Sequence, residues 1–260
     1  MKKARLNFYL TEALCGIVSA IQKVVFMGEF YLSTDCVLTE GQPINQQIYG
    51  FLRRAIIECR LLPDDPLSEN DVAAAFKISR QPVREALIKL AENDFVIICP
   101  KKATKVRRIS KSHVLQGIFI RRNLESAVIA QCAGDISAAT LQKLRELIDR
   151  QEDAAAHYRI HEHFALDDEF HSTILLSAGF DRVLDLVLAV KGAMDRVRFL
   201  SIENEVSPIG RTCTAHRRIL SALQKRDPQA AAAAMAAHMQ ETSDSLEKVI
   251  TRSNPLFFED

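Results

Sequence analysis

Apolar residues recur at helical spacing along most of the chain, and turn-forming segments divide them into two groups. In the first group, which starts after Gly41-Gln42-Pro43, the spacing predicts helices over 44–59, 68–76 and 80–93. Two short runs with strand character follow, at 95–99 and 104–108, around a Pro-Lys-Lys-Ala turn. Three helices and a basic hairpin over 43–110 form the outline of a winged helix-turn-helix domain.

The second group covers residues 111–250 and is helical throughout. The spacing predicts six helices, over 111–133, 137–156, 160–178, 181–202, 208–226 and 228–250. Ser207 and Asp227 are predicted to cap the last two, with Pro208 and Pro228 in their first turns. The predicted fold is therefore mainly α: an N-terminal winged helix-turn-helix domain, a C-terminal all-α helical bundle, and a tail over 251–260.

The first 42 residues contain a basic start followed by an apolar run over 13–27. The run superficially resembles a secretory signal, but Gln22 and Lys23 interrupt it. It is also too short and too polar to span a membrane. Two interpretations stay open for residues 1–42. They form an accessory helix, or they are an extension from a start codon assigned too early, with Met27 as an alternative start.

The net charge of +1 conceals a division along the chain. Residues 43–112 carry 13 Lys and Arg against 8 Asp and Glu, whereas residues 113–260 carry 17 against 21. Only the first segment is thus predicted to meet a polyanion. The six cysteines are scattered without a Cys-x-x-Cys pair, which favours reduced thiols and a cytoplasmic location.

The helix predicted from residue 80 has the pattern of a DNA recognition helix. Ser79 suits the N-cap, where its hydroxyl can accept from a free backbone amide of the first turn. An apolar stripe through Val83, Leu87 and Leu90 faces the core. Arg80 and Arg84 lie four residues apart on a different face, near the helix N-terminus. Arginines in the first turns of such a helix read guanine edges in the major groove.

Four residues of the predicted bundle have metal-ligand chemistry. Asp167 and His171 are four apart, so they share one face of a helix, and His216 and His238 lie on two later helices. Three imidazoles and a carboxylate suit a divalent ion such as Zn²⁺, Ni²⁺ or Mn²⁺. The spacing does not show that the helices converge, so structural or exposed histidines remain the alternative.

Several of these segments resemble a known family. The segments Leu61-Leu62-Pro63, Leu67-Ser68-Glu69 and the block 79–90 are similar to the DNA-binding domain of GntR-type bacterial transcription regulators. The helical part resembles the effector domain of the FadR subgroup, in its metal-containing, FCD-type branch. The segments 43–49 and 223–227 are most similar to the RspR-type repressors of that branch.

The resemblance implies a set of DNA contacts. Ser79 and Gln81 would face phosphate or sugar, Arg80 and Arg84 would face bases, and Lys101 and Lys102 would approach the DNA from the tip of the wing. A homodimer would present two recognition helices to a short inverted repeat in double-stranded DNA.

The chain departs from the family at three turn positions, where relatives carry glycine and this sequence has Asp64, Asp94 and Ala103. Aspartate tolerates a left-handed backbone better than most residues, so Asp64 and Asp94 are expected to adopt it. Ala103 fits such a position less well, because its side chain disfavours a positive φ.

The resemblance also implies the ligand set Asp167, His171, His216 and His238, whereas His113, His157, His161 and His163 match no motif position. Arg121, four residues before Glu125, matches an Arg-x-x-x-Glu motif. Its guanidinium would bind a small carboxylated effector, a sugar acid or another organic acid. An ion pair between Arg121 and Glu125 within the helix is the alternative.

The function expected from the sequence is a dimeric, effector-responsive transcription regulator, a repressor of a catabolic operon, with no membrane partner. A regulator that senses the metal itself is one alternative. A metal-dependent hydrolase or lyase is the other, but an enzyme would leave the block 79–90 and the basic hairpin without a role. The chain is therefore predicted not to be an enzyme.

Overall fold

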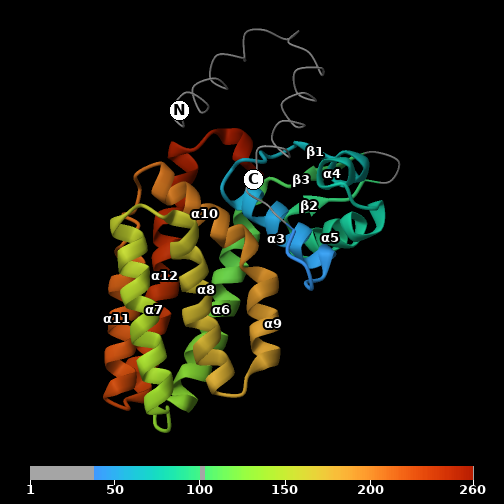
Figure 1. Cartoon of the computed structure of the whole chain (residues 1–260). Helices are drawn as coiled ribbons and strands as arrows, with labels where there is room; N and C mark the ends of the chain where they lie inside the picture. Colours follow the sequence, from blue (N-terminus) through green and yellow to red (C-terminus); the bar gives the residue numbers. More distant parts are fainter. Residues whose placement is uncertain (1–37, 100–102, 260) are drawn as a thin grey trace.

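The computed structural model describes residues 38–99 and 103–259. The predictions for residues 1–37, and the wing-tip residues Lys101 and Lys102, lie outside the described residues. Two units are visible in Figure 1: a small domain of three helices and short strands, and a long bundle of helices below and beside it. This confirms the predicted fold class.

The small domain has the winged helix-turn-helix topology. Its helices are α3 (Ile44–Ile57), α4 (Glu69–Phe76) and α5 (Arg80–Glu92). Its strands are β1 (Pro66–Leu67), β2 (Val96–Ile97) and β3 (Thr104–Val106), which form an antiparallel sheet in the order β1-β3-β2. Buried residues of all three helices, including Leu52, Val72 and Leu87, share one apolar core.

Local chemistry fixes the turns between these elements. The Ser68 hydroxyl accepts from the Asp71 amide at 3.4 Å and caps α4. Asp64 and Asp94 have φ of 66° and 61°, which confirms that aspartate takes the left-handed conformation at these two turns. Ser79 occupies the N-cap of α5 with an extended backbone, but its hydroxyl makes no capping hydrogen bond. The prediction of that bond was wrong, and the exposed hydroxyl keeps its capacity to contact a ligand.

The bundle has the following helices: α6 (Lys111–Cys132), α7 (Ala138–Ala156), α8 (Ile160–Ser177), α9 (Asp181–Val190), α10 (Gly192–Glu203), α11 (Arg211–Gln224) and α12 (Pro228–Arg252). Helix α12 packs along α6 and α11, and its alanines, such as the fully buried Ala231, allow a close approach. The Asp227 carboxylate accepts from the Ala230 amide at 2.9 Å and caps α12, as predicted.

Two predicted boundaries were wrong. The segment 181–202 is two helices, α9 and α10, separated at Lys191. Its apolar spacing continues through the break, so the sequence pattern gave no signal of it. Helix α11 starts at Arg211 with Gly210 at its N-cap, so Pro208 lies in the turn before the helix and Ser207 does not cap it.

The two domains pack directly against each other. Helix α3 contacts α10, and Ile160 and Phe199 of the bundle join the apolar core of the small domain. Gly192 lies against the Phe95 ring so closely that a Cβ atom there would stand 2.7 Å from it. A residue without a side chain is therefore required where α10 meets the small domain.

The chain end returns to the connection between the domains. After a short 3-10 helix, Pro255–Phe257, strand β5 (Phe258–Glu259) pairs in parallel with β4 (Ile109–Ser110), the last segment before the bundle. Figure 1 shows the C-terminus at this junction. Within the described ranges, no helix has the length and apolarity needed to cross a membrane.

The contact at Gly192 gives a stability prediction. Gly192→Ala should lower the free energy of unfolding by about 1–3 kcal/mol, because the new methyl group must displace the Phe95 ring. Chemical denaturation measures this change. The control is Gly50→Ala in α3, where nothing lies within 4 Å of an added Cβ, and it should be neutral or stabilising by about 0.5–1 kcal/mol. Equal stability of the two variants would contradict the close packing.

Candidate functional site

The four predicted metal ligands meet inside the bundle. Asp167 and His171 come from α8, His216 from α11 and His238 from α12, and one ligand atom of each lies within 4.8 Å of all the others. All four side chains are buried, with His238 the most exposed at 8%. The convergence that the sequence left open is thus present in the fold.

The donor atoms fit a divalent cation. The Nε2 atoms of His171 and His238 are 3.2 Å apart, close to the roughly 3.3 Å expected for two imidazole nitrogens on one tetrahedral ion. The Nε2 atom of His216 is 3.5 Å from an Asp167 oxygen, and it is buried without a hydrogen-bond partner among the described residues. A cation bound by these groups would satisfy that nitrogen, as a buried polar atom requires.

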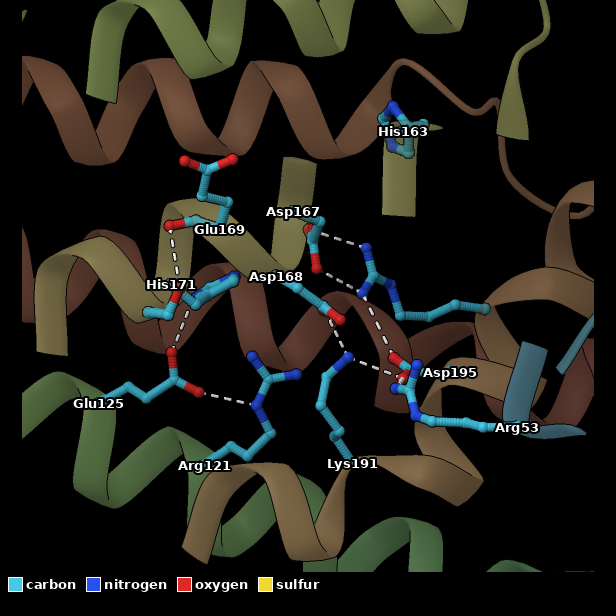
Figure 2. A network of polar contacts seen from close by, with 12 residues as sticks. Arg53, Arg121, Glu125, His163, Asp167, Asp168, Glu169, His171, Lys191 and Asp195 are labelled. Atoms are coloured by element: carbon cyan, nitrogen blue, oxygen red, sulfur yellow. Dashed lines mark hydrogen bonds and ion pairs between the residues drawn. The ribbon is translucent and has the colours of Figure 1, made fainter. Parts of the chain in front are cut away.

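Two further side chains orient the imidazoles. The side-chain amide oxygen of Gln151, Oε1, lies 2.8 Å from His216 Nδ1, and a Glu125 carboxylate oxygen lies 2.6 Å from His171 Nδ1. Figure 2 shows the second contact. Both hold the Nδ1 proton outward and turn Nε2 towards the site, which is how partners of metal-binding histidines act. Sequence reasoning missed Gln151, because nothing in the α7 pattern distinguishes it from an ordinary polar residue.

The electrostatic environment keeps the imidazoles of His216 and His238 neutral. Burial, together with the neighbouring histidines, holds the pKa of His216 well below its usual range and lowers that of His238 to about 3. Burial raises the pKa of Glu125, but Arg121 and His171 outweigh it and the pKa falls to about 2. Neutral imidazoles and ionised carboxylates are the forms that bind metals.

Arg121 forms the ion pair within α6 that the sequence left as an alternative. Its Nε atom donates to Glu125 at 2.7 Å, and both side chains are almost fully buried (Figure 2). Arg121 therefore supports Glu125, which in turn orients His171. Whether Arg121 also binds an effector stays a prediction.

Arg198 of α10 is a site residue that sequence reasoning missed. It donates to both oxygens of Asp167, at 2.7 and 2.9 Å. Burial raises the pKa of Asp167, but Arg198 outweighs it and the pKa lies well below its usual range. The sequence predicted one helix over 181–202, whereas α10 is a separate helix that begins after Lys191. The direction of the Arg198 side chain therefore could not be predicted from the sequence.

A small pocket of about 50 Å³ opens beside the ligands, and Arg198 and His238 line both the pocket and the cluster. His163 lines it as well, although it matched no motif. Its other polar lining residues are Ser201, Ser207, Arg211, Thr212, Glu241, Thr242 and Ser245. The Ser201 hydroxyl is buried without a hydrogen-bond partner within the described part of the chain. The pocket thus offers cationic groups and hydroxyls to a small polar ligand.

The exposed face of α5 carries the predicted DNA-reading residues. The side chains of Arg80 and Arg84 are 60% and 53% exposed, and both contact one carboxylate, that of Glu69 in α4, at 3.1 and 3.0 Å. Gln81 is exposed on the same helix and donates to Glu85. The predicted face is therefore open to solvent, and its two arginines share the Glu69 carboxylate.

Comparisons with known proteins place both domains. Residues 44–106 match the family described as bacterial regulatory proteins, gntR family, and residues 117–241 match the FCD domain. The HTH-type transcriptional repressor RspR of Escherichia coli K12 is 38% identical over 229 residues, which are 88% of this chain and all of that protein. An HTH-type transcriptional regulator in an unstable DNA locus of Streptomyces ambofaciens is 32% identical over 85% of this chain and 93% of its own.

Solved structures agree on the fold. E. coli McbR/YncC superposes with a TM-score of 0.69 at 19% identity, covering 82% of this chain and 99% of that one. A GntR regulator from Rhodococcus sp. RHA1 gives a TM-score of 0.64 at 24% identity, with 81% and 99% covered.

The orientation of His216 gives a prediction about metal affinity. Gln151→Ala should weaken Zn²⁺ binding about 10–100-fold, because His216 loses the acceptor that directs its Nε2 inward. Competition with a chromophoric chelator measures the dissociation constant. Gln151→Glu keeps the acceptor and should retain affinity, and Gln142→Ala, exposed on the same helix, should behave as the unmodified chain. Unchanged affinity in Gln151→Ala would exclude this role for Gln151.

Proposed function

The chain belongs to the gntR family of bacterial regulatory proteins, with an FCD domain, and we propose that it is a repressor controlled by a small organic acid bound beside a metal ion. The family makes it a DNA-binding transcription regulator rather than an enzyme. The convergence of Asp167, His171, His216 and His238 next to a pocket that Arg198 lines carries this proposal. The relative described as a transcriptional repressor supports repression rather than activation.

The DNA contacts that we propose follow from α5. Arg80 and Arg84 would read bases and Ser79 and Gln81 would face the backbone, with Lys101 and Lys102 as further contacts. Two copies of this domain in a homodimer would meet a short inverted repeat. Such a protein would act in the cytoplasm on the promoter of a catabolic operon.

The proposal of an anionic effector rests on charge balance. The contacts around the ligand cluster join four cations, Arg53, Arg121, Lys191 and Arg198, to four carboxylates, Glu125, Asp167, Asp168 and Asp195. A divalent ion would add two positive charges to this buried, balanced network. Because burial of uncompensated charge is costly, an anion beside the ion is favoured.

A metal-sensing regulator is the second candidate, and the donor set itself favours it. One aspartate and three histidines already complete a tetrahedral site for Zn²⁺, which leaves no ligand position for an acid. A six-coordinate ion such as Ni²⁺ or Mn²⁺ would keep two positions open. The metal preference therefore separates the two candidates.

Selection from random double-stranded DNA tests the DNA contacts. We expect an inverted repeat, and Arg80→Ala or Arg84→Ala should each weaken its binding by about 1–3 kcal/mol, because each loses a base contact. Fluorescence anisotropy at fixed salt measures the affinity. Arg182→Ala in α9, where the side chain is 90% exposed, is the control and should bind normally. Normal binding by both α5 variants would contradict the proposed recognition face.

Titration of the metal and of acids onto the protein–operator complex tests whether an organic acid regulates DNA binding. With Ni²⁺ or Mn²⁺ bound, one of a panel of lactate, tartrate, citrate and gluconate should change operator affinity about 5–150-fold, the usual range of coupling between sites. Anisotropy of the labelled operator is again the measurement. If the metal alone produces the whole change and every acid is silent, the protein is a metal sensor.

A further inference from the structure

The boundary between the domains contains a buried carboxylate that contacts both of them. Asp195 of α10 is 1% exposed, and its Oδ2 atom accepts from Arg53 of α3 at 2.6 Å and from Lys191 at 2.7 Å. Lys191 also donates to Asp168, the neighbour of the ligand Asp167. Figure 2 shows these contacts in one continuous group that leads from the ligand cluster to Arg53.

The second oxygen of Asp195 is available to another donor. Among the described residues, Oδ1 of Asp195 is buried and accepts no hydrogen bond. Arg198 Nη1 lies 3.8 Å from it, while the same nitrogen donates to Asp167 at 2.7 Å. Arg198 thus lies between two carboxylates, one in the metal-ligand set and one at the boundary, and a movement of about 1 Å would bring it into hydrogen-bond range of the second.

The state of Asp167 decides which carboxylate Arg198 prefers. In the structure, the guanidinium occupies both oxygens of Asp167. If Asp167 binds a divalent cation, the guanidinium loses at least one of these acceptors and meets like charge at short range. Asp195 Oδ1 is a buried acceptor only 3.8 Å from Arg198 Nη1, so Arg198 would move towards it.

Arg198 would then weaken the contact that holds the DNA-binding domain. A third cation on the Asp195 carboxylate competes with Arg53 and Lys191 for the same charge. Arg53 is the most exposed of the three, at 23% against 13% for Arg198 and 3% for Lys191, so water can replace its partner most easily. Arg53 also lies 5.7 Å from the ring of Phe95, which packs on Gly192, so its release loosens the boundary.

We propose that Asp195 is a shared acceptor through which the ligand state of Asp167 reaches the DNA-binding domain: Arg198 exchanges Asp167 for Asp195, and Arg53 is released. This inference rests on the proposed metal centre. It adds to that centre a defined route to α3, made of three side chains, Arg198, Asp195 and Arg53, that sequence reasoning did not single out.

Hydrogen exchange of the full chain, read by mass spectrometry with and without Zn²⁺, tests the route. In the unmodified chain, Zn²⁺ should slow exchange in α8 and α11 and accelerate it in α3 about tenfold, the size expected for loss of a charged hydrogen bond. Arg53→Gln should keep the response of α8 and α11, whereas its α3 should exchange at one rate with and without Zn²⁺. Arg54→Gln, the adjacent and exposed arginine of α3, should respond as the unmodified chain.

The outcomes separate the inference from the function on which it rests. An α3 response to Zn²⁺ that persists in Arg53→Gln, or an unmodified chain in which only α8 and α11 respond, overturns the route and leaves the metal centre intact. A chain in which α8 and α11 also fail to respond overturns the metal centre and the route together. Because Arg53→Gln is compared with itself at two metal concentrations, a general loss of stability cannot imitate the expected result.

Discussion

The balance of buried charge constrains the middle of this protein more than any other interaction. A row of carboxylates and cations runs from Glu125 through Asp167 and Asp195 to the boundary with the DNA-binding domain, and none of its central members reaches open solvent. Each carboxylate there stays ionised because burial is offset by at least one cation, as the lowered pKa values of Glu125, Asp167 and Asp195 show. Removing any one group would strand its partner, so the helices that supply them are fixed relative to one another.

A carboxylate shared between cations also occurs on the DNA-binding face. Glu69 pairs with Arg80 and Arg84, and these two guanidinium groups outweigh the effect of its slight burial, so the pKa of Glu69 is lowered. A carboxylate that holds two arginines in place reduces the side-chain entropy lost when they meet bases. The Glu69 carboxylate also competes with DNA phosphates for the two guanidinium groups. This competition favours base edges, which offer directed hydrogen bonds, over phosphates as partners of the arginines.

The sequence was sufficient where a pattern is local. The apolar stripe of α5, the cap at Asp227 and the left-handed aspartates at 64 and 94 depend on neighbours within a few residues, and the structure agrees with them. Asp167 and His171 share a face for the same reason. The apolar spacing could not predict that His216 and His238 lie at the same site. That prediction came from the resemblance to a family.

The rest depends on contacts between segments far apart in the chain. At the break between α9 and α10, the Lys191 ammonium group binds Asp168 and Asp195, and Gly192 lies against Phe95. Neither contact is visible in the apolar spacing of residues 181–202, so the sequence predicted one helix there and Arg198 was missed. Gln151 was missed because its importance lies in one bond to a residue 65 positions away.

The pairing of β5 with β4 ties the order of synthesis to the geometry of the finished protein. The DNA-binding domain leaves the ribosome first and has its own apolar core, so it can fold while the bundle is still being made. Its connection to the bundle, however, gains its partner strand only from Phe258–Glu259, which follow the whole bundle in the sequence. A chain that stops before Phe258 would carry a folded DNA-binding domain on a connection whose β4 strand lacks this partner.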